Sequence, residues 1–277
     1  MAVGSFRLPA GGSSVSVSYD PDAEAFFTAT LITNTIQKNA VNTLVLDLKS
    51  YGIWNKMKAI YPMVSDAATS SLRAGQHKYN LKDPRNSNSA FRLSFIGGWT
   101  HSATGALPNG ISYADTFLNP ATVIANVNNG HLSYYSRTNS SGINKIEIGN
   151  RDNSSSFNLV IKFGASNISG ACINMSDTNT FTNNTDSTGF YHANQNNTAN
   201  VRKMFKNGSV LATQTIAQNA QPSLNVYIGA RNFNNVATFY SNRETAFASV
   251  GNGLTDTEAA NFYTAVQAFQ TTLGRQV

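Results

Sequence analysis

The C-terminal part of the chain begins with a strand pattern. Apolar residues occupy every second position from 224 to 228, which predicts a strand with one buried face. A looser alternation from 237 to 250 predicts a second strand, which Gly251 and Gly253 end. Two neighbouring strands of this kind need further strands against which to bury their apolar faces.

A helix is predicted directly after these strands. Thr255 and Glu258 have the three-residue spacing of a capping box, in which the two side chains bond each other's backbone N–H groups at a helix start. The apolar residues that follow recur at helical spacing, at Ala259, Phe262, Tyr263, Val266 and Phe269. The chain therefore ends with a short amphipathic helix.

The N-terminal part combines an arm with a helical segment. Residues 1–20 contain Gly-Gly-Ser-Ser and a short alternating strand, and form either a disordered terminus or an arm that pairs with a neighbouring subunit. Residues 21–74 predict a helical hairpin or collar up to Pro62, followed by a loop. The apolar residues of this segment recur at helical spacing, and such a face usually packs against the core. Five of them are nevertheless candidate assembly residues: Ile36, Leu44, Leu48, Trp54 and Met57.

The remainder, residues 75–277, is rich in short strand patterns. The candidate strands before residue 224 are 77–81, 91–95, 97–101, 113–118, 131–137, 145–149, 157–163, 171–175, 188–193, 201–206 and 210–215. Asn207-Gly208, between the last two, predicts a two-residue hairpin. Short strands that follow one another without intervening helices predict a mainly β domain, a jelly-roll sandwich of two antiparallel sheets.

Composition narrows the class of protein. Hydrophobic residues make up 41% of the 277 positions, enough for a core, whereas charged residues make up 12%, about half the usual share. Asn, Ser and Thr supply the polarity instead, which is typical of particle proteins and secreted modules. The net charge of +6 comes from scattered bases, so we expect no nucleic-acid partner.

Further observations concern the compartment. Cys172 stands alone, so no disulfide can form within the chain. The N-terminus lacks the basic and apolar stretches of a signal peptide, and no apolar run reaches the roughly 18 residues of a membrane span. We therefore expect a protein that is made in a cytoplasm and is not inserted in a membrane.

The acidic residues do not form a catalytic pattern. Retaining glycoside hydrolysis requires two carboxylates about 5 Å apart. Of the four glutamates, Glu24 lies at the helical entry and Glu258 in the cap, and Glu147 is isolated. Glu244 follows Arg243, with which we expect an ion pair. We therefore predict no enzymatic activity.

Metal-ligating patterns are sparse. The four histidines stand far apart, without the close pairs that zinc sites use, and no cofactor is predicted. Two loops rich in Asp and Asn leave open a calcium site or ordinary polar turns. The first contains Asp177, Asn179, Asn183, Asn184 and Asp186, and the second contains Asn150, Asp152 and Asn153.

Aromatic residues supply the candidates for glycan binding, because sugars stack on exposed rings and bond neighbouring amide and carboxylate groups. The candidates are Trp99, His101, Tyr134, Tyr135 and Tyr191. Tyr134 and Tyr135 are adjacent, so in a strand one of these two rings must face outward.

The C-terminal motifs resemble a known fold family. Lys206-Asn-Gly-Ser-Val-Leu211, Val226-Tyr-Ile-Gly-Ala-Arg231 and Leu254-Thr-Asp-Thr-Glu258 are similar to the closing hairpins and final helix of concanavalin A-like, laminin-G-type jelly rolls. The resemblance is carried by the C-terminal residues and, in the middle of the chain, by strand rhythm. It implies a concanavalin A-like sandwich with a lectin-like surface.

A second resemblance spans most of the chain. The segments Tyr79-Asn-Leu-Lys-Asp-Pro84, Gly97-Gly-Trp-Thr-His-Ser102, Gly105-Ala-Leu-Pro-Asn-Gly110 and Tyr113-Ala-Asp-Thr116, together with the C-terminal Thr272-Leu-Gly-Arg-Gln-Val277, look like structural proteins of tailed phages that infect Bacteroidetes. This resemblance implies a virion component and no chemistry.

The residues and resemblances together predict a phage virion structural protein, as a fibre, decoration or adhesion module. It would assemble with other virion proteins and with copies of itself, and would display its lectin-like surface to a host glycan. The alternative is a stand-alone carbohydrate-binding lectin. A glycan hydrolase is a third reading, which the acidic residues disfavour.

Overall fold

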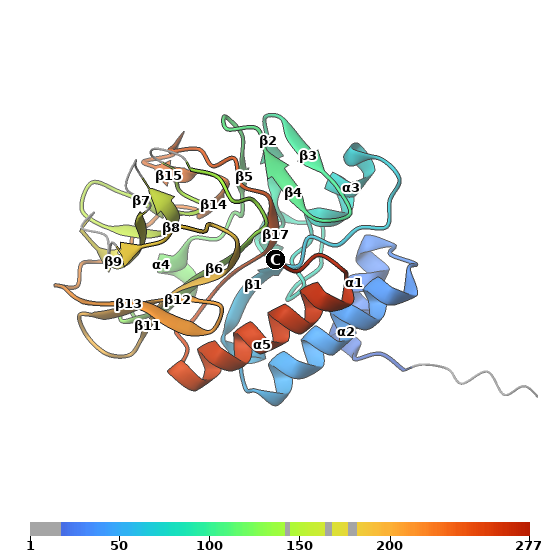
Figure 1. Cartoon of the computed structure of the whole chain (residues 1–277), viewed down its shortest axis with the longest axis horizontal. Coiled ribbons are helices and arrows are strands. Elements are labelled where there is room, and N and C mark those ends of the chain that lie inside the picture. The colour runs from blue at the N-terminus through green and yellow to red at the C-terminus, as the bar shows by residue number, and fades with distance from the viewer. Residues whose placement is uncertain (1–17, 142–144, 164–167, 177–181) are drawn as a thin grey trace, which may run out of the picture.

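The computed structural model describes residues 18–141, 145–163, 168–176 and 182–277 (Figure 1). Two sheets, antiparallel apart from one short pairing, form a sandwich, as the strand rhythm predicts. Most of the arm predicted over residues 1–20 lies outside the described residues, as do Asp177 and Asn179 of the first predicted calcium loop.

The first sheet has eight strands, and β17 (Thr245–Gly251) lies near its middle. Strand β1 (Met57–Tyr61) pairs with β17 off the main path of the sheet. The main path runs in the order β13 (Ser209–Thr215), β12 (Val201–Lys206), β11 (Gly189–Asn196), β6 (Asn129–Ser136), β17, β4 (Ala106–Pro108) and β3 (Trp99–His101).

The second sheet has nine strands among the described residues, and two of these, β15 (Arg231–Phe233) and β16 (Val236–Thr238), lie off its main path. The main path runs in the order β10 (Thr182–Asn183), β9 (Ile168–Met175), β8 (Ser156–Phe163), β7 (Ile148–Arg151), β14 (Tyr227–Ile228), β5 (Tyr113–Asp115) and β2 (Ser94–Ile96).

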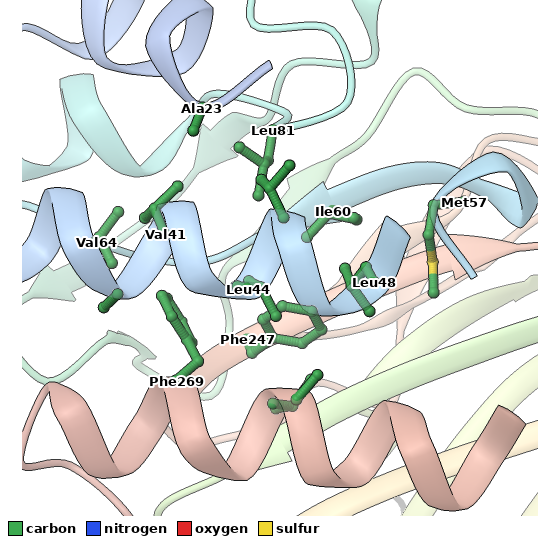
Figure 2. Close-up of a cluster of buried hydrophobic side chains, with 14 of the residues drawn as sticks. Ala23, Val41, Leu44, Leu48, Met57, Ile60, Val64, Leu81, Phe247 and Phe269 are labelled. Carbon is green, nitrogen blue, oxygen red and sulfur yellow. The ribbon is translucent and has the colours of Figure 1, made fainter. Parts of the chain in front are cut away.

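Alternation along the strands divides the apolar residues between two cores. In β17, Ala248 and Val250 point into the core between the sheets, whereas Phe247 points to the outer face of the eight-stranded sheet. The helices α2 (Thr35–Ser50) and α5 (Asp256–Thr272) cover this outer face, and they lie side by side in Figure 1. Figure 2 shows Leu44 of α2 and Phe269 of α5 beside Phe247 in this second core.

Short helices complete the chain. Helix α1 (Pro21–Thr30) packs against α2, and α3 (Ser70–His77) lies next to β3. The others are α4 (Pro120–Val123) and the 3-10 turns η1 (Trp54–Lys56) and η2 (Asn88–Ala90).

Two local predictions are confirmed at the residues that carry them. Thr255 and Glu258 form a complete capping box at the start of α5. Asn207 and Gly208 join β12 to β13 with φ angles of 49° and 77°, the left-handed conformation that a tight hairpin turn requires.

Three predictions of elements are wrong. Residues 57–61 are not helical but form β1, and all its residues except Lys58 are buried, so the strand shows no alternation. The predicted loop before residue 77 contains α3. Thr69 caps the start of this helix, because its side chain accepts a hydrogen bond from the Leu72 N–H. The strand predicted over 77–81 is therefore absent from this described segment. Because β1 pairs with β17, segment 21–74 shares a sheet and a core with segment 75–277.

The expected ion pairs are also different. Arg243 is fully buried and pairs with Glu147, which also accepts a 2.7 Å bond from the Ile161 N–H. Glu244 pairs instead with Arg137 at 3.0 Å. Arg243 and Glu244 are neighbours along an extended backbone, so their side chains point to opposite sides and meet different partners.

Candidate functional site

The three tyrosines predicted to bind glycan lie in the interior. Tyr134 and Tyr191 point between the sheets, where their hydroxyls donate to Arg243 O at 2.7 Å and to Asp186 O at 2.6 Å. Tyr135 points the other way, as alternation requires, but α5 covers it and its hydroxyl meets Gln267 Oε1 at 3.0 Å. The prediction of an outward ring in this pair is therefore wrong, because the outer face of the sheet is itself covered.

Trp99 and His101 occupy another interior cluster. The Trp99 ring is half-buried, and its Nε1–H donates to the backbone of Tyr113 at 3.1 Å. His101 is 6% exposed, and its Nδ1 lies 3.0 Å from Nδ1 of the buried His77. His101 therefore offers no open ring face for sugar stacking, and Trp99 is only partly accessible.

The five predicted assembly residues divide into two groups. Leu44, Leu48, Trp54 and Met57 are at most 6% exposed and belong to the core under α2 and α5, so most of their apolar surface is used within the chain. Figure 2 shows Leu44, Leu48 and Met57 in this core. Ile36 is 59% exposed, at the start of α2. Only Ile36 of this set offers surface to a partner.

A polar cavity borders Trp54. It has a volume of about 360 Å³ and is lined by Asp22, Lys49, Gly52, Trp54 and Asn55. The start of α1, the end of α2 and the turn η1 form its walls. We call this space the Trp54 cavity.

The antiparallel packing of α1 and α2 brings the charged residues of the cavity together. Lys49, in the last turn of α2, bonds Asp20 and Asp22 at the start of α1, both at 2.6 Å. Burial alone raises the pKa of Asp20, but the bonds from Lys49 and from the Asp22 N–H outweigh it and hold the pKa below its ordinary value. Asp20 therefore carries its charge at neutral pH.

Two ammonium groups approach the indole ring of Trp54. Lys82 Nζ lies 3.9 Å and Lys49 Nζ 5.6 Å from the ring centroid, within the range of a cation–π contact. Burial lowers the pKa of Lys82; Asp22 opposes this shift, and the positive charges of Lys49 and Lys58 add to it. The cavity thus combines an indole edge with a carboxylate, an ammonium and the exposed amide of Asn55.

This arrangement matches a small polyhydroxylated ligand. A carboxylate and an amide oxygen accept bonds from sugar hydroxyls, an ammonium and an amide nitrogen donate to them, and the 6% of Trp54 that stays exposed adds a small apolar contact. The volume lies in the range of ligand pockets, which starts at about 300 Å³.

Sequence reasoning missed Asp22, Lys49 and Asn55. Asp20 and Asp22 flank Pro21 at the start of a helix, where acidic residues commonly act as caps. Asp20 does cap α1, because its side chain accepts a hydrogen bond from the Asp22 N–H. The contact with Lys49 depends on how α1 turns back on α2. The one available signal was the tryptophan at a helix end, beside an asparagine.

The predicted calcium loops are held by protein groups where the structure describes them. Asp152 accepts bonds from Ser154 and Ser155, and Asp186 accepts from Thr188 and pairs with Lys206 at 3.4 Å. In the described ranges no three His, Cys, Asp or Glu side chains gather as metal ligands would. The bonds that Asp152 and Asp186 accept from Ser154, Ser155 and Thr188 are of the kind that Asp makes in polar turns.

Comparisons with known proteins concern the fold. No family model matches the sequence, and no curated protein matches it. A Trypanosoma rangeli sialidase mutant with trans-sialidase activity is similar at a TM-score of 0.52 and 10% identity, over 82% of this chain and 39% of that one. Domain 4 of the Geobacillus stearothermophilus arabinanase AbnA, in complex with arabinotriose, aligns at a TM-score of 0.48 and 13% identity. This alignment covers 75% of this chain and 98% of that one.

A botulinum neurotoxin type C structure, whose cell entry depends on two ganglioside molecules, aligns at a TM-score of 0.48 and 10% identity, over 79% of this chain and 53% of that one. At these identities the similarity to the sialidase shows a shared fold, a mainly β sandwich. Among the described residues, no helix has the length and apolar character needed to cross a bilayer.

Proposed function

We propose that this protein is a carbohydrate-binding module without catalytic activity, and that the Trp54 cavity holds its sugar. The observation that carries the proposal is the convergence of Trp54, Asp22, Lys49 and Asn55 on one cavity of about 360 Å³. The sialidase that shares the fold is a protein of carbohydrate chemistry, which agrees with this proposal.

The cavity also limits the class of sugar. The lining holds one carboxylate, Asp22, and one ammonium, Lys49, so the lining itself sums to no net charge. A neutral sugar with several free hydroxyls fits this balance better than a polyanion, because each cation that faces the cavity already has a carboxylate or an aromatic partner.

An array of immobilised neutral and acidic glycans tests the proposal. We expect the wild-type protein to bind a subset of neutral glycans, and Asp22→Ala with Asn55→Ala to lose at least tenfold in affinity for them. Asn183→Ala, an exposed asparagine on β10 far along the other sheet, is the matched control and should bind normally. Binding that survives in the double variant would place the sugar elsewhere.

Assembly into a phage virion, with other virion proteins and copies of itself, is our second proposal. Exposed aliphatic side chains on α2 favour it: Ile36 and Leu46 are 59% and 48% exposed. Light scattering of the full chain and of Ile36→Asp separates the two proposals. Oligomers that this substitution dissolves favour assembly, whereas a monomer with glycan affinity favours the binding module.

A further inference from the structure

An apolar groove lies at the opposite end of α1 from the Trp54 cavity. It has a volume of about 280 Å³ between the end of α1 and α3, and its apolar lining comes from Ala29, Leu31, Ala67, Leu72 and Tyr79. We call it the α1–α3 groove. Gly75 adds open space, because a side chain at this position of α3 would meet nothing within 4 Å.

Leu31 is an unusual residue in this position. It ends α1 in the left-handed conformation, with φ of 59°, which costs a residue with a side chain about 1–2 kcal/mol compared with glycine. It also leaves 77% of its surface in water. A leucine that carries both costs at the mouth of an apolar groove points to a covering element.

The walls of the groove are fixed before anything binds. Asp66 accepts bonds from the Thr33 and Asn34 N–H groups at 2.7 and 3.0 Å, and from Gln76 of α3 at 3.0 Å. Gln76 also donates to Thr30 O, in the last turn of α1, at 3.0 Å. Asp66 and Gln76 therefore join the end of α1 to α3, so a ligand would not have to order the groove.

The chain itself has a segment suited to the groove. The sequence before Ser18 carries Val3, Phe6 and Leu8, followed by Gly-Gly-Ser-Ser at 11–14. In an extended segment Phe6 and Leu8 fall on the same side. Ser18 lies ten residues after Leu8, and ten residues reach at most about 33–36 Å when extended.

This reach exceeds the distance to be covered. The described chain starts next to the beginning of α1, and the groove lies at its other end, about 15 Å away for a helix of ten residues. A segment that belongs to the same chain and can reach the groove has an effective concentration of up to about millimolar order. A segment of the same chain therefore competes favourably with a segment from a dilute neighbour.

We propose that residues 3–8 of this chain bind in its own α1–α3 groove, with Phe6 and Leu8 against Leu31 and Leu72. The bound segment covers apolar surface that would otherwise be open to other molecules. This inference is independent of the sugar site.

Photo-cross-linking of the full chain tests the proposal. With p-benzoylphenylalanine in place of Phe6, we expect cross-links at the last turn of α1 and in α3, at the mass of a monomer. Leu31→Asp with Leu72→Asp should lower the yield at least fivefold, and Gly75→Gln should block the groove with a similar loss. Ile111→Asp, at a residue 74% exposed in another loop, is the matched control.

Other outcomes overturn the proposal. A cross-linked dimer would show that the groove takes the arm of a neighbour, and an unchanged yield in Leu31→Asp with Leu72→Asp would show that the arm lies elsewhere. As a second measurement, Phe6→Ser with Leu8→Ser should increase light scattering through the uncovered groove, and adding Leu31→Asp should restore the monomer. A further outcome is oligomers that form both with Phe6 and Leu8 and without them, and that are lost only on Leu31→Asp. That result would assign the groove to a second copy of the chain.

Discussion

The two ends of α1 border surfaces of opposite character. At its start, the Trp54 cavity combines an indole edge with Asp22, Lys49 and the amide of Asn55. At its end, the α1–α3 groove is lined mainly by aliphatic groups, with Leu31 and Leu72 largely exposed. The two sites are separated by one helix of ten residues.

The difference indicates different ligands. A cavity with several fixed hydrogen-bonding groups discriminates among small polar molecules, since a ligand that leaves one group unpaired loses affinity. A groove with aliphatic walls gains its affinity from the apolar area removed from water, which suits a peptide segment. The same helix, α1, can therefore serve recognition at one end and coverage at the other.

The first prediction concerns the support that both sites share. Leu44 of α2 is 1% exposed and packs in the core with Phe247 and Phe269. We expect Leu44→Ala to lower the free energy of unfolding by about 2–5 kcal/mol, through lost burial and a cavity. Urea denaturation measures this loss, and glycan binding and arm cross-linking should weaken together.

Leu46 supplies the control on the same helix. It is 48% exposed, so Leu46→Ala should change the unfolding free energy by about 0.5 kcal/mol or less. A large loss for Leu46→Ala, or a small one for Leu44→Ala, would contradict the packing of α2 on α5.

A second prediction is a loss of stability in mild acid. His131 lies under α5, near Phe262, and burial lowers its pKa to about 4 despite its bond to Asn252 O. The unfolded chain takes up this proton near pH 6.5, so the stabilising contribution is complete above pH 6.5 and is lost as the pH falls to 4. Burial lowers the pKa of His77, His101 and His192 as well, with the same sign.

Urea denaturation at pH 7, 5 and 4 measures this effect. His131 alone corresponds to a decrease of about 3 kcal/mol across the window. An unfolding free energy that stays constant between pH 7 and 4 would contradict the burial of these histidines in neutral form.

A third prediction separates the groove from the cavity. Asp66 joins the α1–α2 loop to α3, and its bonds from Thr33, Gln76 and Asn34 outweigh the effect of burial and lower its pKa to about 2. This contribution is present above pH 3.8 and is lost as the pH falls toward 2. We expect Asp66→Ala to cost about 1–3 kcal/mol and to reduce arm cross-linking while glycan affinity stays unchanged.

Asp83 is the control for this substitution. Its ion pair with Arg85 lies at the surface, so Asp83→Ala should cost about 1 kcal/mol at most. If Asp66→Ala weakened glycan binding as strongly as arm binding, the two ends of α1 would not be independent.

The smallest expected effect is a change of unfolding free energy that has opposite signs in two glycine variants. Leu31→Gly should raise the unfolding free energy by up to about 1 kcal/mol, because glycine accepts the left-handed conformation that ends α1. Leu72→Gly, inside α3, should lower it by about 1 kcal/mol. Thermal denaturation of both variants in the Phe6→Ser, Leu8→Ser background measures the backbone effect alone, and a loss for Leu31→Gly there would contradict the strain at this residue.

The sequence predicts the fold well where local patterns decide the structure. The capping box at Thr255 and the Asn207-Gly208 turn act within a few residues, so their sequence signals are direct. Strand β1 escapes prediction because Met57 and Ile60 face the helices while Ala59 and Tyr61 face the sandwich. A strand buried on both faces has no alternation to detect.

The site escapes prediction for a different reason. Exposed aromatics were expected on the strands, but Tyr135 is covered by α5, which the sequence predicts without saying which face it covers. Asp22 and Lys49 meet only through the turn between α1 and α2. Tertiary packing decides both which aromatic residues remain accessible and which charges surround them.

The fluorescence of Trp54 offers the most direct test of the central claim. The chain has two tryptophans, so Trp99→Phe leaves Trp54 as the sole reporter. Titration with the glycan that the array selects should change its emission saturably, with the dissociation constant that calorimetry gives, and Asp22→Ala with Asn55→Ala should abolish the change. Calorimetric binding that leaves the Trp54 emission unaltered would contradict a sugar site in this cavity.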